Sequence, residues 1–331
     1  MYTVTLIPGD GIGPEVISSA RRVIDAACGN ILWEEVTAGQ CAIPDFGEPI
    51  PDAVIESIKR NKVALKGPLT NIVGKGFRSP NVTLRTKLDL YANIRHARHF
   101  EGVPTKWPGA DLIVVRESTE DSYAGVEQMV GNDSAVAIKF ITRQGSERVI
   151  RKAYEYARAW NRKKLTVSVK ANIMKLTDGM FLKAGQEVSK DYPDIQYDET
   201  IIDALCMHLV RKPEDYDVIV TENCYGDIVS DLAAGIAGGL GLGHGVNLGD
   251  ECAVFESVHG SAPKYTNMNK VNPTAMILSG VLMLRYLKEA EAADRIENAV
   301  AKVLREGKAV TYDLGGTAGT SEMTDEIIRN L

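Results

Sequence analysis

The chain has 331 residues and is 44% hydrophobic, 25% charged and 6% aromatic, an ordinary composition for a globular protein. This length fits two domains or one large α/β unit, and the composition excludes disordered, collagen-like and miniprotein classes. Its 38 basic and 44 acidic side chains give a formal net charge of −6, spread without a basic block. We therefore expect no binding to nucleic acid or to an anionic membrane, and an anionic small substrate would need a local cationic pocket.

The cysteines and the apolar stretches bear on the compartment. The five cysteines are widely separated and never form a C-x-x-C pair, which argues against a disulfide framework or a thiolate metal site. The segment from Met1 to Pro14 lacks the basic flank of a signal peptide, and the longest apolar stretch, from Ala275 to Leu284, is too short to span a bilayer. We expect a cytoplasmic protein.

Apolar runs of strand length alternate with helix-period segments, which predicts parallel βα units. The first strand is expected at 2–7, and a helix follows from Pro14 to Ala27, since proline suits the first turn of a helix. Later strands are expected at 63–66, 112–116, 165–170 and 218–221.

The ends of these strands carry polar residues. Because the carboxyl ends of parallel strands border the ligand crevice of an open sheet, we expect them to converge. This convergence would bring together Lys170 and the segments after Lys66, Val115 and Val220.

Two further segments are distinctive. Residues 128–142 are polar at first and then alternate, which fits a protruding strand arm and an ordinary surface hairpin equally well. The glycine-rich stretch 235–249 is where we expect the chain to return from one domain to another.

Three glycines follow the first strand, at Gly9, Gly11 and Gly13. Their spacing is G-x-G-x-G, with Pro14 directly after, so the fingerprint of a dinucleotide-binding Rossmann unit is not met. The sequence therefore argues against a Rossmann site here.

Asp227 and Asp231 follow the predicted strand at 218–221, and their i, i+4 spacing puts both carboxylates on one helical face. For an isolated pair, a solvated acidic face is the favoured explanation, but the apolar residues that flank this pair make a buried edge plausible. If the pair binds a metal, its hard oxygen donors favour Mg²⁺ or Mn²⁺ over zinc. Asp203, in a helix-like segment, is a candidate third ligand.

Arginines are concentrated near the predicted strand ends, at Arg85, Arg95 and Arg116. Guanidinium groups bind carboxylates in a bidentate way, so three of them with Lys170 would suit a di- or tricarboxylate. Internal pairing with nearby Asp and Glu residues explains the pattern equally well.

Seven motifs, spread over nearly the whole chain, resemble those of the isocitrate, isopropylmalate and homoisocitrate dehydrogenase family and occur in the same order. They are IPGDGIGPEV from Ile7, KGPLT from Lys66, SPNVTLRTKLDLYANIR from Ser79, RESTEDSYAGVE from Arg116, VKANIMKLTDG from Val169, ENCYGDIVSDLAAGIAGGLGL from Glu222 and HGSAPKY from His259.

The resemblance implies an α/β fold of the isocitrate/isopropylmalate dehydrogenase type, which is not a Rossmann fold. It implies a large domain of residues 1–97 and 239–331 and a smaller central domain of residues 98–238 with a dimerisation arm near 124–143. It also implies an obligate homodimer whose active site is shared between subunits.

Within the family, the segment from Ser79 distinguishes the substrates. Isocitrate enzymes resemble S-x-N-x-x-x-R here, with Ser79 and Asn81 contacting the carboxylate that distinguishes isocitrate, whereas isopropylmalate enzymes have apolar residues and homoisocitrate enzymes usually lack the asparagine. An isopropyl group would leave both polar groups unpaired, at roughly 1 to 3 kcal/mol for each buried group. The resemblance thus implies metal-dependent oxidative decarboxylation of isocitrate to 2-oxoglutarate and CO₂.

The same resemblance assigns roles to individual side chains. Arg85, Arg95 and Arg116 would hold the substrate carboxylates. Asp227 and Asp231 would bind the metal from one subunit, with Asp203 and the base-assisting Lys170 contributed by the other. Tyr123 would be the general acid that protonates the enol after decarboxylation.

The choice of cofactor depends on the HGSAPKY motif. Lys264 stands where NAD enzymes of the family usually carry aspartate, and with Tyr265 and Tyr312 it resembles the 2′-phosphate site of NADP enzymes. One residue departs from that pattern, since the arginine expected four positions after Tyr312 is Gly316. We expect NADP preference, with NAD use as the alternative. The expected cofactor-binding residues are Thr70, Asn223, His259, Gly260, Ser261, Ala262, Lys264, Tyr265, Asn272 and Tyr312.

Three rival functions remain. NAD-dependent isocitrate oxidation and homoisocitrate oxidation use the same chemistry, and a non-catalytic regulatory subunit would bind the same ligands. A regulatory subunit should have lost a metal aspartate, the tyrosine or the lysine, yet all are present.

Overall fold

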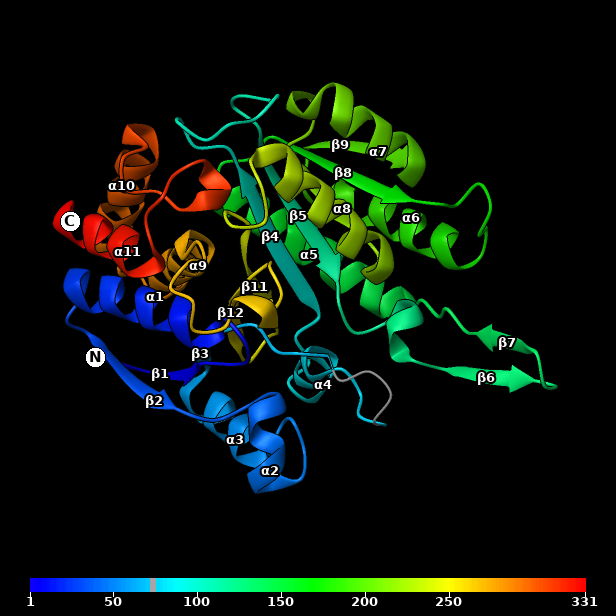
Figure 1. The fold of residues 1–331 in the computed structure, drawn as a ribbon. Coiled ribbons are helices and arrows are strands. Elements are labelled where there is room, and N and C mark those ends of the chain that lie inside the picture. The colour runs from blue at the N-terminus through cyan, green and yellow to red at the C-terminus, as the bar shows by residue number, and fades with distance from the viewer. Residues whose placement is uncertain (72–75) are drawn as a thin grey trace.

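The computed structural model describes residues 1–71 and 76–331, which are arranged around one ten-stranded sheet (Figure 1). In spatial order its strands are β2 (Ile31–Glu35), β1 (Tyr2–Ile7), β3 (Val63–Lys66), β12 (Ala253–Ser257), β11 (His244–Leu248), β4 (Ala92–Arg98), β5 (Asp111–Glu117), β10 (Val218–Thr221), β8 (Lys164–Val169) and β9 (Gln196–Ile201).

The sheet is mixed, and this corrects the expectation of purely parallel units. Four strands run parallel at each end of the sheet, but β11 pairs antiparallel with both β12 and β4, and β4 pairs antiparallel with β5. As a consequence β3 runs opposite to β5, β10 and β8. The strand ends at Lys66 and at Arg116 therefore do not share one parallel edge. The register of the strands between them nevertheless aligns Lys66 with Arg95 of β4 and Val114 of β5.

Helices cover both faces of the sheet. Alternate residues of the central strands enter different cores, with Val218 and Val220 of β10 in one and Ile219 in the other. On the first face lie α1 (Gly13–Ala27), α9 (Thr274–Tyr286), α10 (Ala290–Glu306), α5 (Arg143–Ala159) and α6 (Thr177–Val188). On the second face lie α3 (Asp52–Asn61), α4 (Pro80–Lys87), α7 (Ile202–Arg211) and α8 (Asn223–Ala237). The short α2 (Ile43–Phe46) precedes α3, and α11 (Thr320–Arg329) packs on α1 and α10.

The predicted first strand and helix are confirmed. α1 begins at Gly13 with Pro14 in its first turn, and its buried apolar residues recur at helical spacing. The apolar stretch from Ala275 to Leu284 is the buried body of α9, which explains its composition without a membrane. None of the described helices combines the length and the apolar character needed to cross a bilayer.

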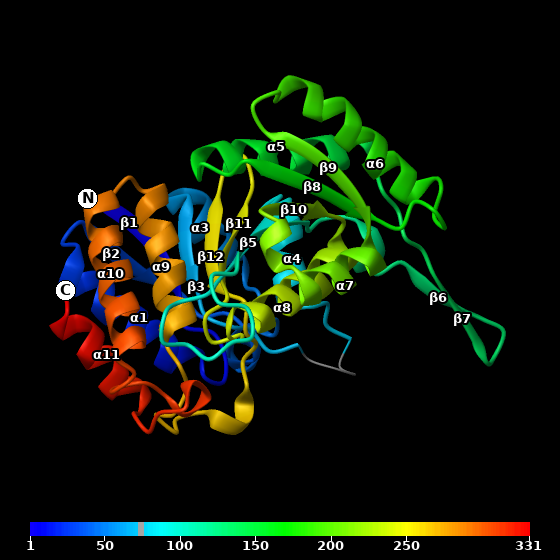
Figure 2. The same cartoon turned by 90° about the horizontal axis from the view of Figure 1, so that it is seen from above.

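The segment after residue 124 forms a hairpin that extends away from the body of the molecule (Figure 2). Its strands β6 (Glu127–Val130) and β7 (Ser134–Ala137) pair antiparallel, and every residue of both is exposed. For residues 128–142 the sequence fitted a protruding strand arm and a surface hairpin equally well. The structure shows features of both, because the segment is a hairpin and it protrudes. The proposed domain boundaries at residues 97 and 238 stay a prediction, because the sheet runs through both parts.

Three short 3-10 turns carry tyrosines expected in the site. They are η2 (Asp121–Ala124), η5 (Pro263–Tyr265) and η6 (Tyr312–Leu314).

Candidate active site

Arg116 lies at the carboxyl end of β5, and its side chain is only 1% exposed. Its Nε and Nη2 donate to Oδ1 of Asn223 at 2.9 and 2.7 Å, and its Nη1 forms an ion pair with Asp227. A guanidinium buried this deeply needs such partners, because an unpaired buried charge is strongly unfavourable. Asn223, which we expected on the cofactor side, is thus engaged with the arginine cluster.

Arg95, on β4, reaches the same carboxylate from the other side. Its Nη2 lies 3.3 Å from Asp227 Oδ1, and its Nη1 lies 3.2 Å from Asp231 Oδ1 and donates to Ser230 Oγ at 2.7 Å. These partners lie on α8, where the predicted i, i+4 spacing places both aspartates on one face. Arg95 therefore bridges the two carboxylates, which otherwise would repel each other.

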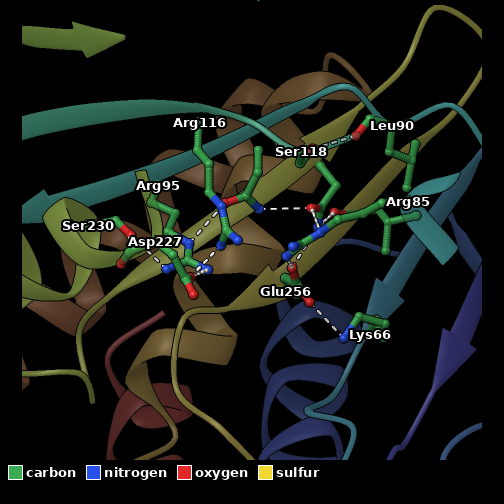
Figure 3. A network of polar contacts seen from close by, with 12 residues as sticks. Lys66, Arg85, Leu90, Arg95, Arg116, Ser118, Asp227, Ser230 and Glu256 are labelled. Carbon is green, nitrogen blue, oxygen red and sulfur yellow. Dashed lines mark hydrogen bonds and ion pairs between the residues drawn. The ribbon is translucent and has the colours of Figure 1, made fainter. Parts of the chain in front are cut away.

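Arg85, on α4, completes the cluster (Figure 3). Its Nε donates to Asn247 Oδ1 at 2.9 Å, and its Nη2 pairs with Glu256 at 3.2 Å. The fully buried Lys66 pairs with the same glutamate at 2.6 Å. Burial opposes ionisation of Glu256, but the charges of Lys66 and Arg85 outweigh it and hold its pKa well below the usual range.

Two amides connect these arginines to one another. Asn93 accepts from Arg95 Nε at 2.9 Å and donates to Asn247 at 2.8 Å, and Asn247 accepts from Arg85. The sequence analysis missed both amides, although Asn93 stands two residues before Arg95 in a strand. That spacing places the two side chains on the same face of β4.

The cluster supports both interpretations of the arginines in part. Each arginine has an internal carboxylate partner, as the pairing hypothesis predicts. The four cations, including Lys66, nevertheless exceed the three carboxylates of Asp227, Asp231 and Glu256 by one. The cluster thus carries a net positive charge within a chain of net negative charge.

Tyr123 lies beside Asp227. Its hydroxyl donates to Oδ2 of Asp227 at 2.6 Å, and the Arg116 guanidinium lies 4.8 Å from the centre of its ring. Burial, reinforced by this hydrogen bond, raises the pKa of Tyr123 to about 12. The turn η2, which carries Tyr123, is tied to α8 by Asp121, whose carboxylate accepts from the backbone N–H of Cys224.

The two aspartates on α8 differ in their surroundings. Burial favours the neutral form of Asp227, but Arg116, Tyr123 and Arg95 outweigh it and lower its pKa. Among residues 1–71 and 76–331, Arg95 is the one cation paired with Asp231, and burial raises the pKa of this aspartate.

Lys170 and Asp203 lie apart from this cluster. Lys170 follows β8 directly and forms an ion pair with Asp203, which is 67% exposed at the start of α7. Among the described residues, no group of three His, Cys, Asp or Glu side chains is arranged to hold a metal ion. One chain therefore assembles only two of the three predicted metal aspartates.

Ser79 and Asn81 lie at the start of α4. Ser79 donates from Oγ to Asn71 Oδ1 at 2.7 Å. The side-chain oxygen of Asn81 is buried and has no hydrogen-bond partner in the described part of the chain. Buried polar atoms normally have partners, so this amide suits a polar ligand group.

The expected phosphate-binding residues come together at the other end of the site. The rings of Tyr265 and Tyr312 have centroids 6.0 Å apart, and Lys264 Nζ lies 4.9 Å from the Tyr265 ring. The structure also places Lys270 here, 4.7 Å from the Tyr312 ring. The sequence analysis missed this lysine, which stands six residues after Lys264.

The glycine-rich loop after β1 packs against the HGSAPKY segment. Ile12 donates its N–H to the carbonyl of Ser261 at 2.9 Å, and Ser261 Oγ lies 2.8 Å from Thr70 Oγ1. A Cβ at Gly11 would lie 2.0 Å from the Ser261 oxygen, so only glycine allows this approach. Close packing against Ser261 therefore explains the need for glycine at position 11 without a Rossmann dinucleotide site.

His259 and Asn272 flank this loop. His259 Nδ1 is hydrogen-bonded to the carbonyl of Gly260 at 3.1 Å, while its Nε2 is buried without a partner among the described residues. Burial lowers the pKa of His259, which favours the neutral ring. Asn272 donates to Asp313 at 3.0 Å, and Ala262 adopts a left-handed conformation with φ of +36°.

Comparison with known proteins agrees with this architecture. The sequence profile described as isocitrate/isopropylmalate dehydrogenase matches residues 3–327. The chain belongs to the isocitrate/isopropylmalate dehydrogenase family. The fold that the sequence resemblance implied is thereby confirmed.

Relatives within the isocitrate/isopropylmalate dehydrogenase family carry different cofactor names. The chain is 47% identical over 334 residues to isocitrate dehydrogenase [NADP] of Thermus thermophilus, covering 99% of this chain and 67% of that protein. It is also 47% identical over 334 residues to the mitochondrial isocitrate dehydrogenase [NAD] regulatory subunit 1 of Arabidopsis thaliana, covering 99% and 89%. A crystal structure of isocitrate dehydrogenase from Methylococcus capsulatus superposes with a TM-score of 0.97 at 49% identity, covering 100% and 99%.

Proposed function

We propose that the chain is an NADP-preferring, metal-dependent isocitrate dehydrogenase that converts isocitrate to 2-oxoglutarate and CO₂. The observation that carries the proposal is the buried cluster of Arg85, Arg95 and Arg116 beside Tyr123 and Asp227. Three guanidinium groups at one site match a substrate with three carboxylates, and the tyrosine places a proton donor next to them.

The start of α4 supports isocitrate among the family's substrates. The Ser79 hydroxyl and the Asn81 side-chain NH₂ group can each donate a hydrogen bond. A substrate carboxylate would accept from them, whereas the Asn81 oxygen, which has no partner among the described residues, needs a donor. An isopropyl group could accept from neither, and the buried Asn81 amide would stay unpaired at a cost of roughly 1 to 3 kcal/mol, whereas Ser79 keeps its bond to Asn71.

The donor set on α8 fits a hard divalent cation. Asp227 and Asp231 would hold Mg²⁺ or Mn²⁺ with the help of Asp203 from a second copy of the chain. Such an ion, when bound, withdraws electrons from the substrate's hydroxyl and keto oxygens. In the single chain, Arg95 and Arg116 form ion pairs with Asp227. When Asp227 binds a metal ion instead, these arginines would become free to pair with the substrate carboxylates.

The proton transfers fall to two side chains. Oxidation removes a hydride from C2 and a proton from its hydroxyl, and Lys170 of a second copy would assist that deprotonation. Loss of CO₂ leaves an enol, which needs a proton at C3. Tyr123 would give this proton, since its raised pKa keeps it protonated at neutral pH and its hydroxyl already donates to Asp227.

The surface around Lys170 supports a homodimer. Large apolar side chains are exposed on the hairpin, on the turn after Lys170 and on the neighbouring helices α6, α7 and α8. They are Val126, Met129, Val130, Val136, Ile138, Phe140, Ile173, Met174, Leu176, Met180, Met207, Val210 and Ile228. An exposed apolar surface of this extent is unusual for a monomer, and a second copy of the chain would cover it.

The pair of Tyr265 and Tyr312 supports the proposed preference for NADP. Lys264, Tyr265 and Tyr312 present a cation and two hydroxyls where an NAD enzyme would need an acceptor for ribose hydroxyls. The buried His259 ring, whose pKa is lowered by burial, offers a nitrogen that has no partner in the part of the chain that the structure describes.

A steady-state assay tests the cofactor preference. It follows the reduction of NADP and of NAD, each titrated with isocitrate and Mg²⁺ present. We expect kcat/KM to be at least about tenfold higher with NADP, the value of one charged contact. Equal or higher efficiency with NAD would reject the preference while leaving the isocitrate activity in place.

A regulatory role is the second candidate, because one relative is named a regulatory subunit. All of Tyr123, Lys170, Asp203, Asp227 and Asp231 are present, which favours catalysis. Absence of turnover with either cofactor, in a sample that binds isocitrate, would favour the regulatory role.

A further inference from the structure

The cation at Lys270 lies outside the set of phosphate contacts that the family resemblance supplies. Its Nζ is 4.7 Å from the centre of the Tyr312 ring, just as Lys264 Nζ is 4.9 Å from the centre of the Tyr265 ring. The two ammonium groups thus flank the tyrosine pair. Among the ion pairs of the described residues, none involves either lysine, so both charges are available to an anion.

The loop at Gly316 explains why a second lysine is needed. Gly316 donates its N–H to Thr311 O at 3.0 Å, and Ala318 donates to Val310 O at 3.1 Å, which closes the loop tightly. A Cβ at position 316 would lie 2.0 Å from the Val310 oxygen. The loop therefore has no room for the arginine of the resembling NADP enzymes, and a cation on this side must come from another element.

The backbone before Lys270 is held firmly. The carboxylate of Glu15 accepts from the N–H groups of Asn267 and Asn269 at 2.9 and 2.8 Å. The Asn269 side chain accepts from Ser321 N at 2.8 Å, and its carbonyl accepts from Thr320 N at 3.1 Å. These contacts fix the loop to α1 and α11, so little additional ordering is needed before Lys270 can bind a ligand.

The local charge also favours an anion. Asp313 is the acidic residue next to Tyr312, and its two oxygens accept from Thr311 at 2.6 Å and Asn272 at 3.0 Å. Hydrogen bonding with Tyr312, then the charge of Lys264 and more weakly that of Lys270, lowers the pKa of Tyr265. Each tyrosine of the pair thus has an ammonium group beside its ring, and ammonium and phenolic hydroxyl groups are donors that a phosphate dianion can use.

We propose that Lys270 is a specificity-determining residue that binds the 2′-phosphate of NADP together with Lys264, Tyr265 and Tyr312, in place of the arginine missing at Gly316. This inference rests on the proposed NADP preference. It adds a residue that recognises the phosphate and does not take part in the chemistry.

The test compares Lys270→Met with Lys302→Met, a matched control at an exposed lysine of α10. Binding of 2′,5′-ADP and of 5′-AMP to the full-length protein is measured by calorimetry, and KM is measured for NADP and NAD. We expect Lys270→Met to weaken the binding of 2′,5′-ADP and to raise the KM for NADP, each by about tenfold, because one charged contact is lost. Binding of 5′-AMP and the NAD KM should stay within about twofold, and Lys302→Met should change neither.

The outcomes separate this inference from the proposed function. If the wild type binds 2′,5′-ADP more tightly than 5′-AMP and Lys270→Met binds it equally well, the role of Lys270 is wrong and the NADP preference stands. If Lys270→Met weakens the binding of 2′,5′-ADP and of 5′-AMP by the same factor, the lysine only supports the loop, and the inference is overturned. If the wild type does not distinguish the two nucleotides, the NADP preference and the inference fail together.

Discussion

The surroundings of Tyr123 keep its hydroxyl protonated and hydrogen-bonded to Asp227. Its hydroxyl donates to Asp227 at 2.6 Å, the Arg116 guanidinium lies over its ring, and its pKa is raised to about 12. Among 12 tyrosines in the chain, nothing in the local sequence singles it out. The family motif RESTEDSYAGVE identified the residue, and the contacts give the physical reason.

Tyr123→Phe should lower kcat by about 10²-fold or more and leave the isocitrate KM nearly unchanged, because a general acid acts in the transition state. Arg116 and Arg95 still hold Asp227 in this variant, so the cluster should keep its shape. Steady-state kinetics with Tyr286→Phe, an exposed tyrosine outside the site, supply the control. Turnover close to that of the wild type would reject the assigned role.

At the scale of elements, the hairpin is tied to the turn that carries Lys170. Lys139, at the base of the hairpin, pairs with the buried carboxylates of Asp178 and Glu222. Asp178 also accepts from the backbone N–H of Lys170 at 2.8 Å and from Tyr225 at 3.1 Å. A change in the base of the hairpin is therefore transmitted to Lys170 through one carboxylate.

Lys139→Met would leave two buried carboxylates without their cation, and we expect it to lower the free energy of unfolding by about 3 to 5 kcal/mol. Lys183→Met, at a 72% exposed lysine whose ion pair spans 4.0 Å, should change it by less than about 1 kcal/mol. Denaturant unfolding at one protein concentration measures both. Equal stabilities of the two variants would contradict the anchoring role of Lys139.

Local patterns in the sequence predicted the elements better than their arrangement. The strand from Tyr2 to Ile7, the helix from Gly13 and the aspartate pair on α8 follow from hydrophobic period and helical spacing. The antiparallel insertion of β11 between β12 and β4 pairs strands far apart in sequence, which periodicity does not encode. For the same reason Asn247 of β11 was not predicted, whereas Asn93 could have been found from its spacing to Arg95.

At the scale of the whole molecule, one chain does not bring all of the predicted site residues together. Tyr123, Asp227 and the arginines lie together, whereas Lys170 and Asp203 pair with each other beside the exposed apolar surface. The proposed dimer would bring the Lys170 group of one copy to the Tyr123 group of the other. This arrangement makes a prediction that does not depend on the substrate.

Mixed dimers of Tyr123→Phe and Lys170→Met, isolated with two different tags after co-expression, should recover about half of the wild-type activity. One of their two sites carries both substitutions and the other carries neither, if the residues come from different subunits. Mixed dimers of Tyr123→Phe and Asp231→Asn are the control, because those two residues belong to one chain and both sites stay defective. Equal, low activity in both mixtures would contradict a shared site.

The central claim is that the arginine cluster recognises isocitrate, and a comparison of kcat/KM for isocitrate, homoisocitrate and isopropylmalate with saturating NADP and Mg²⁺ tests it most directly. We predict that isocitrate exceeds both others by about 10²-fold or more, since each competitor loses at least one hydrogen-bonded contact to Ser79 or Asn81. Higher efficiency with homoisocitrate or isopropylmalate, or no turnover with any of the three, would contradict the claim.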